Sequence, residues 1–416
     1  GGGKYQSKAD NVVISISGAD TKIATLYAGG YDAGLTSNTL ETPLAESVNG
    51  VQTVKLTMEG GEITEGIGCG GGQGYTRTGK STVNLKGVKI AAFYGVLANG
   101  RADDIEATVT NCTFAKVNSY YEFASVNRGT VGNITCTFDG CTFNDLENIN
   151  ACLGPINGWA DSDTDGKIIP CVTGKVKFEF KNTKGNAPVM QLGQGLENAN
   201  IELIGAKAKL ATFTKKTNNN PAITISEFGI AEGKTWTFDN DKPLSIDKDI
   251  TLSGKGTING HIVLSGENVT LKGLTVNATS IGTNGPQKTV ILGSCDKVTI
   301  QDCKLNGIVP EADKSKYVAN GIDLITKSAS ASYTITGNTI TGCNNLVDNW
   351  TAINICIQDA NSSKVDNAAI ALKNTYDDKS FGYVRQTAKD AWQYVYVNGA
   401  DDYKAANAFY CMREKG

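Results

Sequence analysis

The stretch VTLKGLTV, from Val269 to Val276, carries the pattern that decides the fold. Apolar residues at its first and third positions alternate with polar ones, a Gly stands fifth, and an apolar residue stands eighth. Alternation with a period of two is typical of a strand with one buried face. A Gly can adopt a left-handed backbone at little cost. The stretch therefore predicts a short strand, a one-residue bend and a second short strand.

The same eight-residue pattern recurs along most of the chain. Further copies read LTMEGGEI from Leu56, VNLKGVKI from Val83, ATVTNCTF from Ala107, CTFDGCTF from Cys136, FEFKNTKG from Phe178, IELIGAKA from Ile201, VTIQDCKL from Val298 and YTITGNTI from Tyr333. The fifth position is always Gly, Asn or Asp: Gly60, Gly87, Asn111, Gly140, Asn182, Gly205, Gly273, Asp302 and Gly337. These are the residue types that tolerate a left-handed backbone.

The distances between copies give the length of one coil. Successive copies start 27, 24, 29, 42, 23, 68, 29 and 35 residues apart. A spacing in the twenties predicts one turn of an all-β parallel β-helix, whose coils stack about 4.8 Å apart. The longest gap holds further coils, for example from Trp236 and Ile250, and the gap of 42 predicts an inserted loop. Cys112 and Cys141, both at the sixth position, are expected to stack inside.

The repeat resembles that of the pectin-lyase-like family over roughly residues 12–356. The resemblance implies a single-stranded, right-handed parallel β-helix, a solenoid with a cap at each end. We expect an N-terminal cap and first coil over 1–50, and coils over 51–356. An inserted loop is expected near 144–175, irregular coils near 205–250, and a C-terminal coil and cap over 357–416.

Composition narrows the function classes. The chain has 416 residues, a net charge of −3, 40% hydrophobic residues and 48 Gly. A basic stripe is absent from the sequence, which argues against a nucleic-acid partner. An apolar run of the roughly 20 residues that span a membrane is absent too. The opening Gly1–Gly3 suggests a tether behind a lipidated Cys upstream of Gly1, and we expect a monomer.

The most specific local motif is DSDTDGKI, from Asp161 to Ile168. Its alternating carboxylates, followed by a Gly, resemble the start of an EF-hand calcium loop. They are Asp161, Asp163 and Asp165. The twelfth position is Val172, where EF-hands place a bidentate Glu. Two interpretations stay open, a calcium site and a solvated acidic loop. Cys152 and Cys171 bracket this loop, so a disulfide between them is a further alternative.

A second constellation combines cations with aromatic and acidic residues. Arg77, Arg101 and Arg128 precede successive copies by six, six and eight residues, which predicts one edge of three adjacent coils. Candidate ligand-binding residues near them are Asp103, Asp104, Tyr120, Tyr121 and Phe123. Arginine pairs with carboxylates in a bidentate way, so this edge could bind an acidic glycan. The alternative is a solvated row of charges.

Two hypotheses for function follow. The first is a secreted or cell-surface β-helix that binds a polysaccharide or host-surface glycan, like an adhesin, without catalysis. The second is a polysaccharide lyase or glycoside hydrolase that acts on an acidic polysaccharide. The resemblance to pectate lyases implies that Arg101 or Arg128 would then serve as the base. His261, the one histidine, is expected at the surface or at a turn and has no ligand partner at metal-site spacing.

Overall fold

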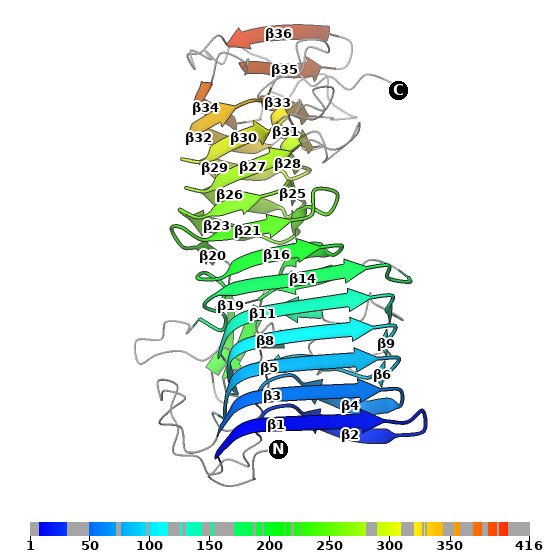
Figure 1. Cartoon of the computed structure of the whole chain (residues 1–416). Coiled ribbons are helices and arrows are strands. Elements are labelled where there is room, and N and C mark those ends of the chain that lie inside the picture. Colours follow the sequence, from blue (N-terminus) through cyan, green and yellow to red (C-terminus); the bar gives the residue numbers. More distant parts are fainter. Residues whose placement is uncertain are drawn as a thin grey trace. The chain divides into compact units, whose positions relative to one another are not determined.

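The computed structural model describes the strands and most of the turns that connect them. The described residues are 8–30, 50–71, 76–96, 100–114, 125–126, 130–143, 151–153, 170–185, 189–193, 195–211, 213–217, 220–225, 227–279, 289–308, 320–326, 328, 331–343, 353–357, 369–376, 382–388 and 391–397. Every regular element among them is a strand (Figure 1). They form two compact units, 1–225 and 226–416, which are described separately.

The first unit is built on a long parallel ladder of strands, called ladder 1a (Figure 1). Its strands, in the order in which they pair, are β1 (Lys8–Ser17), β3 (Gly50–Glu59), β5 (Arg77–Lys86), β8 (Arg101–Thr110), β11 (Thr130–Asp139), β14 (Lys175–Lys181) and β16 (Asn200–Ile204). Each repeat contributes one strand, and each strand pairs with the strand of the next repeat.

Two further parallel ladders complete the first unit. Ladder 1b contains β2 (Lys22–Tyr27), β4 (Glu62–Gly68), β6 (Lys89–Ile90), β7 (Phe93–Val96), β9 (Thr113–Phe114), β10 (Ser125–Val126) and β12 (Thr142–Phe143). Ladder 1c contains β13 (Ala151–Leu153), β15 (Val189–Leu192) and β17 (Lys207–Leu210). An antiparallel hairpin, β18 (Phe213–Thr217) and β19 (Asn220–Ile225), follows.

The second unit contains three parallel ladders and an antiparallel pair. Ladder 2a contains β20 (Glu227–Ile230), β23 (Ile250–Gly254), β26 (Asn268–Lys272), β29 (Lys297–Gln301), β32 (Ser332–Thr341) and β34 (Ala369–Tyr376). Ladder 2b contains β21 (Thr235–Phe238), β24 (Thr257–Asn259), β27 (Thr275–Thr279), β30 (Lys304–Ile308) and the end of β32. Ladder 2c contains β22 (Leu244–Ile246), β25 (Ile262–Leu264), β28 (Thr289–Gly293), β31 (Asn320–Thr326) and β33 (Ile353–Ile357). The antiparallel pair is β35 (Gly382–Ala388) and β36 (Ala391–Val397).

The repeat windows found in the sequence are in register in the structure. In the first unit, Leu56 pairs with Val83, Val83 with Ala107, Ala107 with Cys136 and Cys136 with Phe178. These five residues are the first positions of five successive copies. Neighbouring strands of the sheet thus pair through the same positions of the sequence repeat.

One copy departs from this register. Phe178 pairs with Leu203, not with Ile201, the residue that begins the next copy. The strand before the bend at Gly205 is thus displaced by two residues from the register of the other copies, although Gly205 is a left-handed bend as predicted. A shift of two keeps the same side chains on the buried face, so the hydrophobic pattern alone could not reveal it.

The fifth position of each copy is a left-handed bend. All nine predicted bend residues have a positive φ, from 48° at Asn182 to 75° at Gly205 and Gly273. The non-glycine residues with positive φ in the described part of the chain are Asn111, Asn182 and Asp302, and all three occupy this position. The prediction of a one-residue bend between two strands is confirmed.

The inward side chains form a stacked hydrophobic core in each unit. Alternate residues of β5, β8 and β11 are buried. Phe138 and Phe180 stack with ring centroids 4.9 Å apart, and Phe114 and Phe143 stack at the same distance. Like residues on neighbouring coils face each other, which aligns aromatic rings for such contacts. Cys112 and Cys141 are buried as reduced thiols beside this core, as the sequence predicted.

The observed architecture is all-β with long parallel sheets, and it is consistent with a parallel β-helix. Within the predicted cap over 1–50, the described residues form β1, β2 and the first residue of β3. Within 357–416 they form the last residue of β33 together with β34, β35 and β36. The described residues contain no helix that is long and apolar enough to span a membrane.

Candidate functional site

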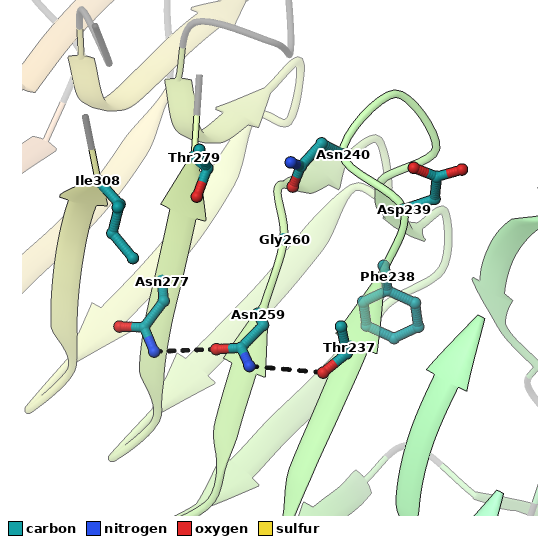
Figure 2. A pocket seen from close by; sticks show the side chains of 9 residues that line it. All are labelled: Thr237, Phe238, Asp239, Asn240, Asn259, Gly260, Asn277, Thr279 and Ile308. Atoms are coloured by element: carbon teal, nitrogen blue, oxygen red, sulfur yellow. Dashed lines mark hydrogen bonds between the residues drawn. The ribbon is translucent and has the colours of Figure 1, made fainter. Parts of the chain in front are cut away.

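A pocket of about 410 Å³ lies in the second unit, on the outer side of ladder 2b (Figure 2). Its lining is mostly polar and uncharged: Thr237, Phe238, Asp239, Asn240, Asn259, Gly260, Asn277, Thr279 and Ile308. Strands β21, β24, β27 and β30 supply most of these residues, and the turn after β21 supplies Asp239 and Asn240. The pocket is thus assembled from like positions on consecutive coils.

Hydrogen bonds join the amides at the centre of this pocket. Asn277 Nδ2 donates to Asn259 Oδ1 at 2.9 Å, and Asn259 Nδ2 approaches Thr237 Oγ1 at 3.4 Å (Figure 2). Thr237 pairs with Asn259 in the sheet, and Asn259 pairs with Asn277. Parallel pairing in register therefore fixes the spacing of the side chains, and the hydrogen bonds fix their orientation.

The strand alternation explains why these side chains point outward. Each follows a buried residue: Trp236 precedes Thr237, Ile258 precedes Asn259 and Val276 precedes Asn277. Because successive side chains in a strand point to opposite faces, a buried residue is followed by one on the outer face. Burial of the apolar residues thus holds the polar ones in a fixed array.

An asparagine amide has two N–H donors and a carbonyl oxygen with two lone pairs. The hydrogen bonds within the array use one donor and one acceptor site of Asn259. Each such side chain therefore keeps both a donor and an acceptor for a ligand. Hydroxyl groups of a sugar match this pair, since a hydroxyl both donates and accepts.

The rim of the pocket adds one carboxylate and one apolar side chain. Asp239 Oδ2 lies 3.6 Å from Lys242 Nζ, so its charge is partly balanced by a neighbour outside the lining. Ile308 is 42% exposed and lies in register with Thr279. An exposed aliphatic side chain beside hydroxyl and amide groups suits a sugar ring, which has apolar C–H surfaces and polar edges.

His261 follows the lining residue Gly260 directly in the chain. It lies in the turn between β24 and β25, as expected, but it is fully buried. Its Nδ1 lies 2.5 Å from the carbonyl oxygen of Thr289, and its Nε2 lies 3.0 Å from that of Thr279. The imidazole thus lies between the carbonyl oxygen of Thr279, a lining residue, and that of Thr289 at the start of the next strand.

The structure brings four residues of the predicted cationic edge together in the first unit. Arg77 on β5 pairs with Arg101 on β8, as the spacing predicted. Arg77 Nη2 lies 3.5 Å from Asp103 Oδ1. Asp104 Oδ1 accepts a hydrogen bond from Asn133 Nδ2 at 2.7 Å. These contacts occupy both carboxylates within the ladder itself.

The side chains of this edge differ in burial. Arg101 is 8% exposed and counts among the buried residues. Partial burial raises the pKa of the Asp103 carboxyl; the Arg77 guanidinium opposes that rise, and the Asp104 carboxylate adds to it. The prediction that Arg101 would serve as a base stays a prediction.

Several predicted residues lie outside the described part of the chain. They are Arg128, Tyr120, Tyr121, Phe123, Asp161, Asp163 and Asp165. The calcium prediction for the Asp161 loop and the catalytic prediction for Arg128 therefore stay predictions. Cys171, at the edge of that loop, is a buried reduced thiol. Among the residues that are described, the acidic, cysteine and histidine side chains nowhere gather into a metal-binding group of three or more.

Comparison with known proteins gives this chain no relative: no protein-family model, no curated protein and no solved structure matches it.

The sequence pattern missed the pocket residues although a signal for them was present. The eight-residue window VTLKGLTV ends one residue before Asn277, and VTIQDCKL ends one residue before Asn306. A window of nine residues would have shown Asn at the same place in both copies. A polar residue at the ninth position, directly after the apolar eighth one, predicts a side chain on the outer face of the sheet. The same residue type there in successive copies predicts a row of such side chains.

Proposed function

We propose that this protein is a single-stranded, right-handed parallel β-helix, like those of the pectin-lyase-like family, that binds glycan. Right-handedness is supported by a general rule, because nearly all crossovers between parallel strands of one sheet are right-handed. We further propose that it acts outside the cell or on the bacterial outer surface and binds without catalysis, as an adhesin would.

The observation that carries this proposal is the hydrogen-bonded array of Thr237, Asn259 and Asn277 in the pocket. Oriented amides with spare donors and acceptors are suited to sugar hydroxyls. An exposed Ile308 at the rim supplies an apolar contact. The alternative of a lyase or hydrolase rests on Arg101 and Arg128 alone, since Asp103, the carboxylate next to them, is paired with Arg77.

A glycan microarray followed by calorimetry tests the proposal. The wild-type protein is expected to bind at least one glycan, and Asn277→Ala is expected to weaken that binding by about fivefold or more, since a hydrogen bond contributes about 1 kcal/mol. Asn84→Ala is the matched control, since Asn84 is a half-buried residue of β5 in the first unit, outside the pocket. Absence of wild-type binding to any glycan on the array would overturn the proposal.

A further inference from the structure

The polar array of the pocket continues beyond the pocket. Asn306 Nδ2 donates to Asn277 Oδ1 at 2.8 Å, and Thr341 Oγ1 donates to Asn306 Oδ1 at 2.8 Å. We call the five residues Thr237, Asn259, Asn277, Asn306 and Thr341 the amide row. Neighbours in the row are paired residues on consecutive strands of ladder 2b. Only the first three belong to the pocket lining.

The hydrogen bonds of the amide row all run in the same direction. Thr341 donates to Asn306, Asn306 to Asn277, and Asn277 to Asn259, with Asn259 next to Thr237. Aligned hydrogen bonds of this kind polarise one another. Every asparagine of the row therefore holds the same orientation and offers the same remaining donor and acceptor. A ligand would meet the same pair of groups on the three coils that carry Asn259, Asn277 and Asn306.

A second row on the same outer face is also almost free of charge. It contains Thr235, Thr257, Thr275, Lys304 and Thr339, which are paired in that order. Lys304 is the one ionisable side chain among the ten residues of the two rows. A face with so little charge cannot select an acidic polymer by ion pairing.

Ladder 1b, the corresponding ladder of the first unit, has a contrasting outer face. An ion pair links two of its strands, with Lys22 Nζ on β2 lying 3.4 Å from Glu62 Oε2 on β4. Both units use the same repeat, and outward positions of the repeat can evidently carry charges. The uncharged face of ladder 2b is thus a property of its own residues and not of the fold.

We propose that the amide row is an extended binding site for a neutral, linear glycan that lies across the strands of ladder 2b. The pocket around Asn259 and Asn277 is then one subsite of a longer site that includes Asn306 and Thr341. The groups repeat once per coil, about 4.8 Å apart, so they suit a polymer whose hydroxyls recur along its length. This inference rests on the proposed glycan binding. It adds that the glycan is neutral and that it runs across the strands of ladder 2b.

The test compares affinity with oligosaccharide length. Calorimetry with cello-, manno- and xylo-oligosaccharides, from disaccharides to hexasaccharides, would be run on wild type, Asn277→Ala, Asn306→Ala and Thr341→Ala. We expect Asn306→Ala and Thr341→Ala to weaken the longest bound oligosaccharide by about fivefold. They should leave the shortest one that binds unchanged. Asn277→Ala should weaken both, and Asn84→Ala should weaken neither.

Different failures separate this inference from the proposed function. If Asn277→Ala weakens binding while Asn306→Ala and Thr341→Ala leave every length unchanged, the pocket binds glycan but the extended site is refuted. Oligogalacturonides of the same lengths are titrated as the charged comparison; if only they bind, and salt abolishes the binding, the neutral class is refuted. If no glycan binds, the proposed function itself fails. Thermal unfolding of each variant checks that the fold is intact, and Asn306→Ser replaces Asn306→Ala if that variant does not fold.

Discussion

Asn338 donates a hydrogen bond from Nδ2 to Oδ1 of Asn374, 2.8 Å away on the next coil. Asn338 is 1% exposed, so this contact lies inside the second unit. Its side chain also donates to the carbonyl oxygen of Ile300 at 2.8 Å and accepts from the backbone N–H of Cys303 at 2.9 Å. Ile300 and Cys303 flank the bend residue Asp302 on the preceding coil, so the amide of Asn338 satisfies backbone groups at that bend.

Replacement of Asn338 should therefore destabilise the protein strongly. We expect Asn338→Ala to lower the free energy of unfolding by about 2 kcal/mol or more, because several buried polar groups would lose their partner. Urea unfolding would measure the change. Asn84→Ala, on a strand surface, is the control and should change the free energy of unfolding by less than about 0.5 kcal/mol. Equal effects of the two substitutions would contradict this account.

The bends predict a second, position-dependent series. Gly87→Ala places a side chain at a φ of 61° with open space around it, and Gly205→Ala does so at 75° against the carbonyl oxygen of Phe180. We expect the first to cost about 1–2 kcal/mol from backbone conformation, and the second to cost more because the backbone must move. Gly87→Asn should be nearly neutral, since Asn111 and Asn182 occupy the same bend. Thermal unfolding would rank the three variants by stability. A Gly87→Asn variant as unstable as Gly87→Ala would contradict the prediction that Asn is tolerated at this bend.

The ion pairs on ladder 1a should contribute little to stability. Lys80 and Glu106 are 50% and 52% exposed, although their charged atoms lie 2.9 Å apart. Exposed pairs of this kind contribute about 0.2–1 kcal/mol because solvent screens them. A double-mutant cycle with Lys80→Ala and Glu106→Ala should give a coupling energy in that range at low salt and a smaller one at high salt. A coupling energy well above that range would show that the pair is less solvated than its exposure indicates.

The buried cysteines predict a loss of stability at alkaline pH. Burial raises the pKa of the Cys112 thiol from 9.0 to about 11, and it raises that of the Cys303 thiol by the same amount. The unfolded chain therefore releases these protons at a lower pH than the folded chain does. Their contribution to stability is complete below about pH 9 and is lost as the pH rises towards 11.

Urea unfolding between pH 7 and pH 11 would measure this effect. The double variant Cys112→Ala, Cys303→Ala should lose less stability over that range than wild type does, since it lacks the two groups. Lysine and tyrosine side chains titrate in both proteins and cancel in the comparison. Parallel pH profiles of the two proteins would rule out the contribution of the thiols.

The repeat was predictable because its two signals are local. Alternation of apolar and polar residues marks the strands, and Gly, Asn or Asp at the fifth position marks the bends. Asn111, Asn182 and Asp302 show that the second signal is a backbone requirement, since each has the positive φ that the pattern implied. Such requirements depend on a few neighbouring residues, so they can be deduced from one sequence.

The candidate site was less predictable because its residues act together across coils. Asn259, Asn277 and Asn306 are ordinary polar residues in their own segments, and their significance comes from stacking in register. The charged candidates drew attention because Arg and Asp are chemically distinctive. In the structure, Arg77 and Asp103 contact each other, a pairing that their sequence separation does not reveal.

The left-handed bends also bear on how such a chain can evolve. Codons for Asn change to codons for Asp by a single base, and codons for Asp change to codons for Gly by a single base. The residue types found at the bends, as at Asn111, Asp302 and Gly337, are thus connected by single mutations that all preserve the required φ. Repeats in this chain can therefore diverge in the rest of their sequence while a bend with open space around it, such as that at Gly87, drifts among three residue types.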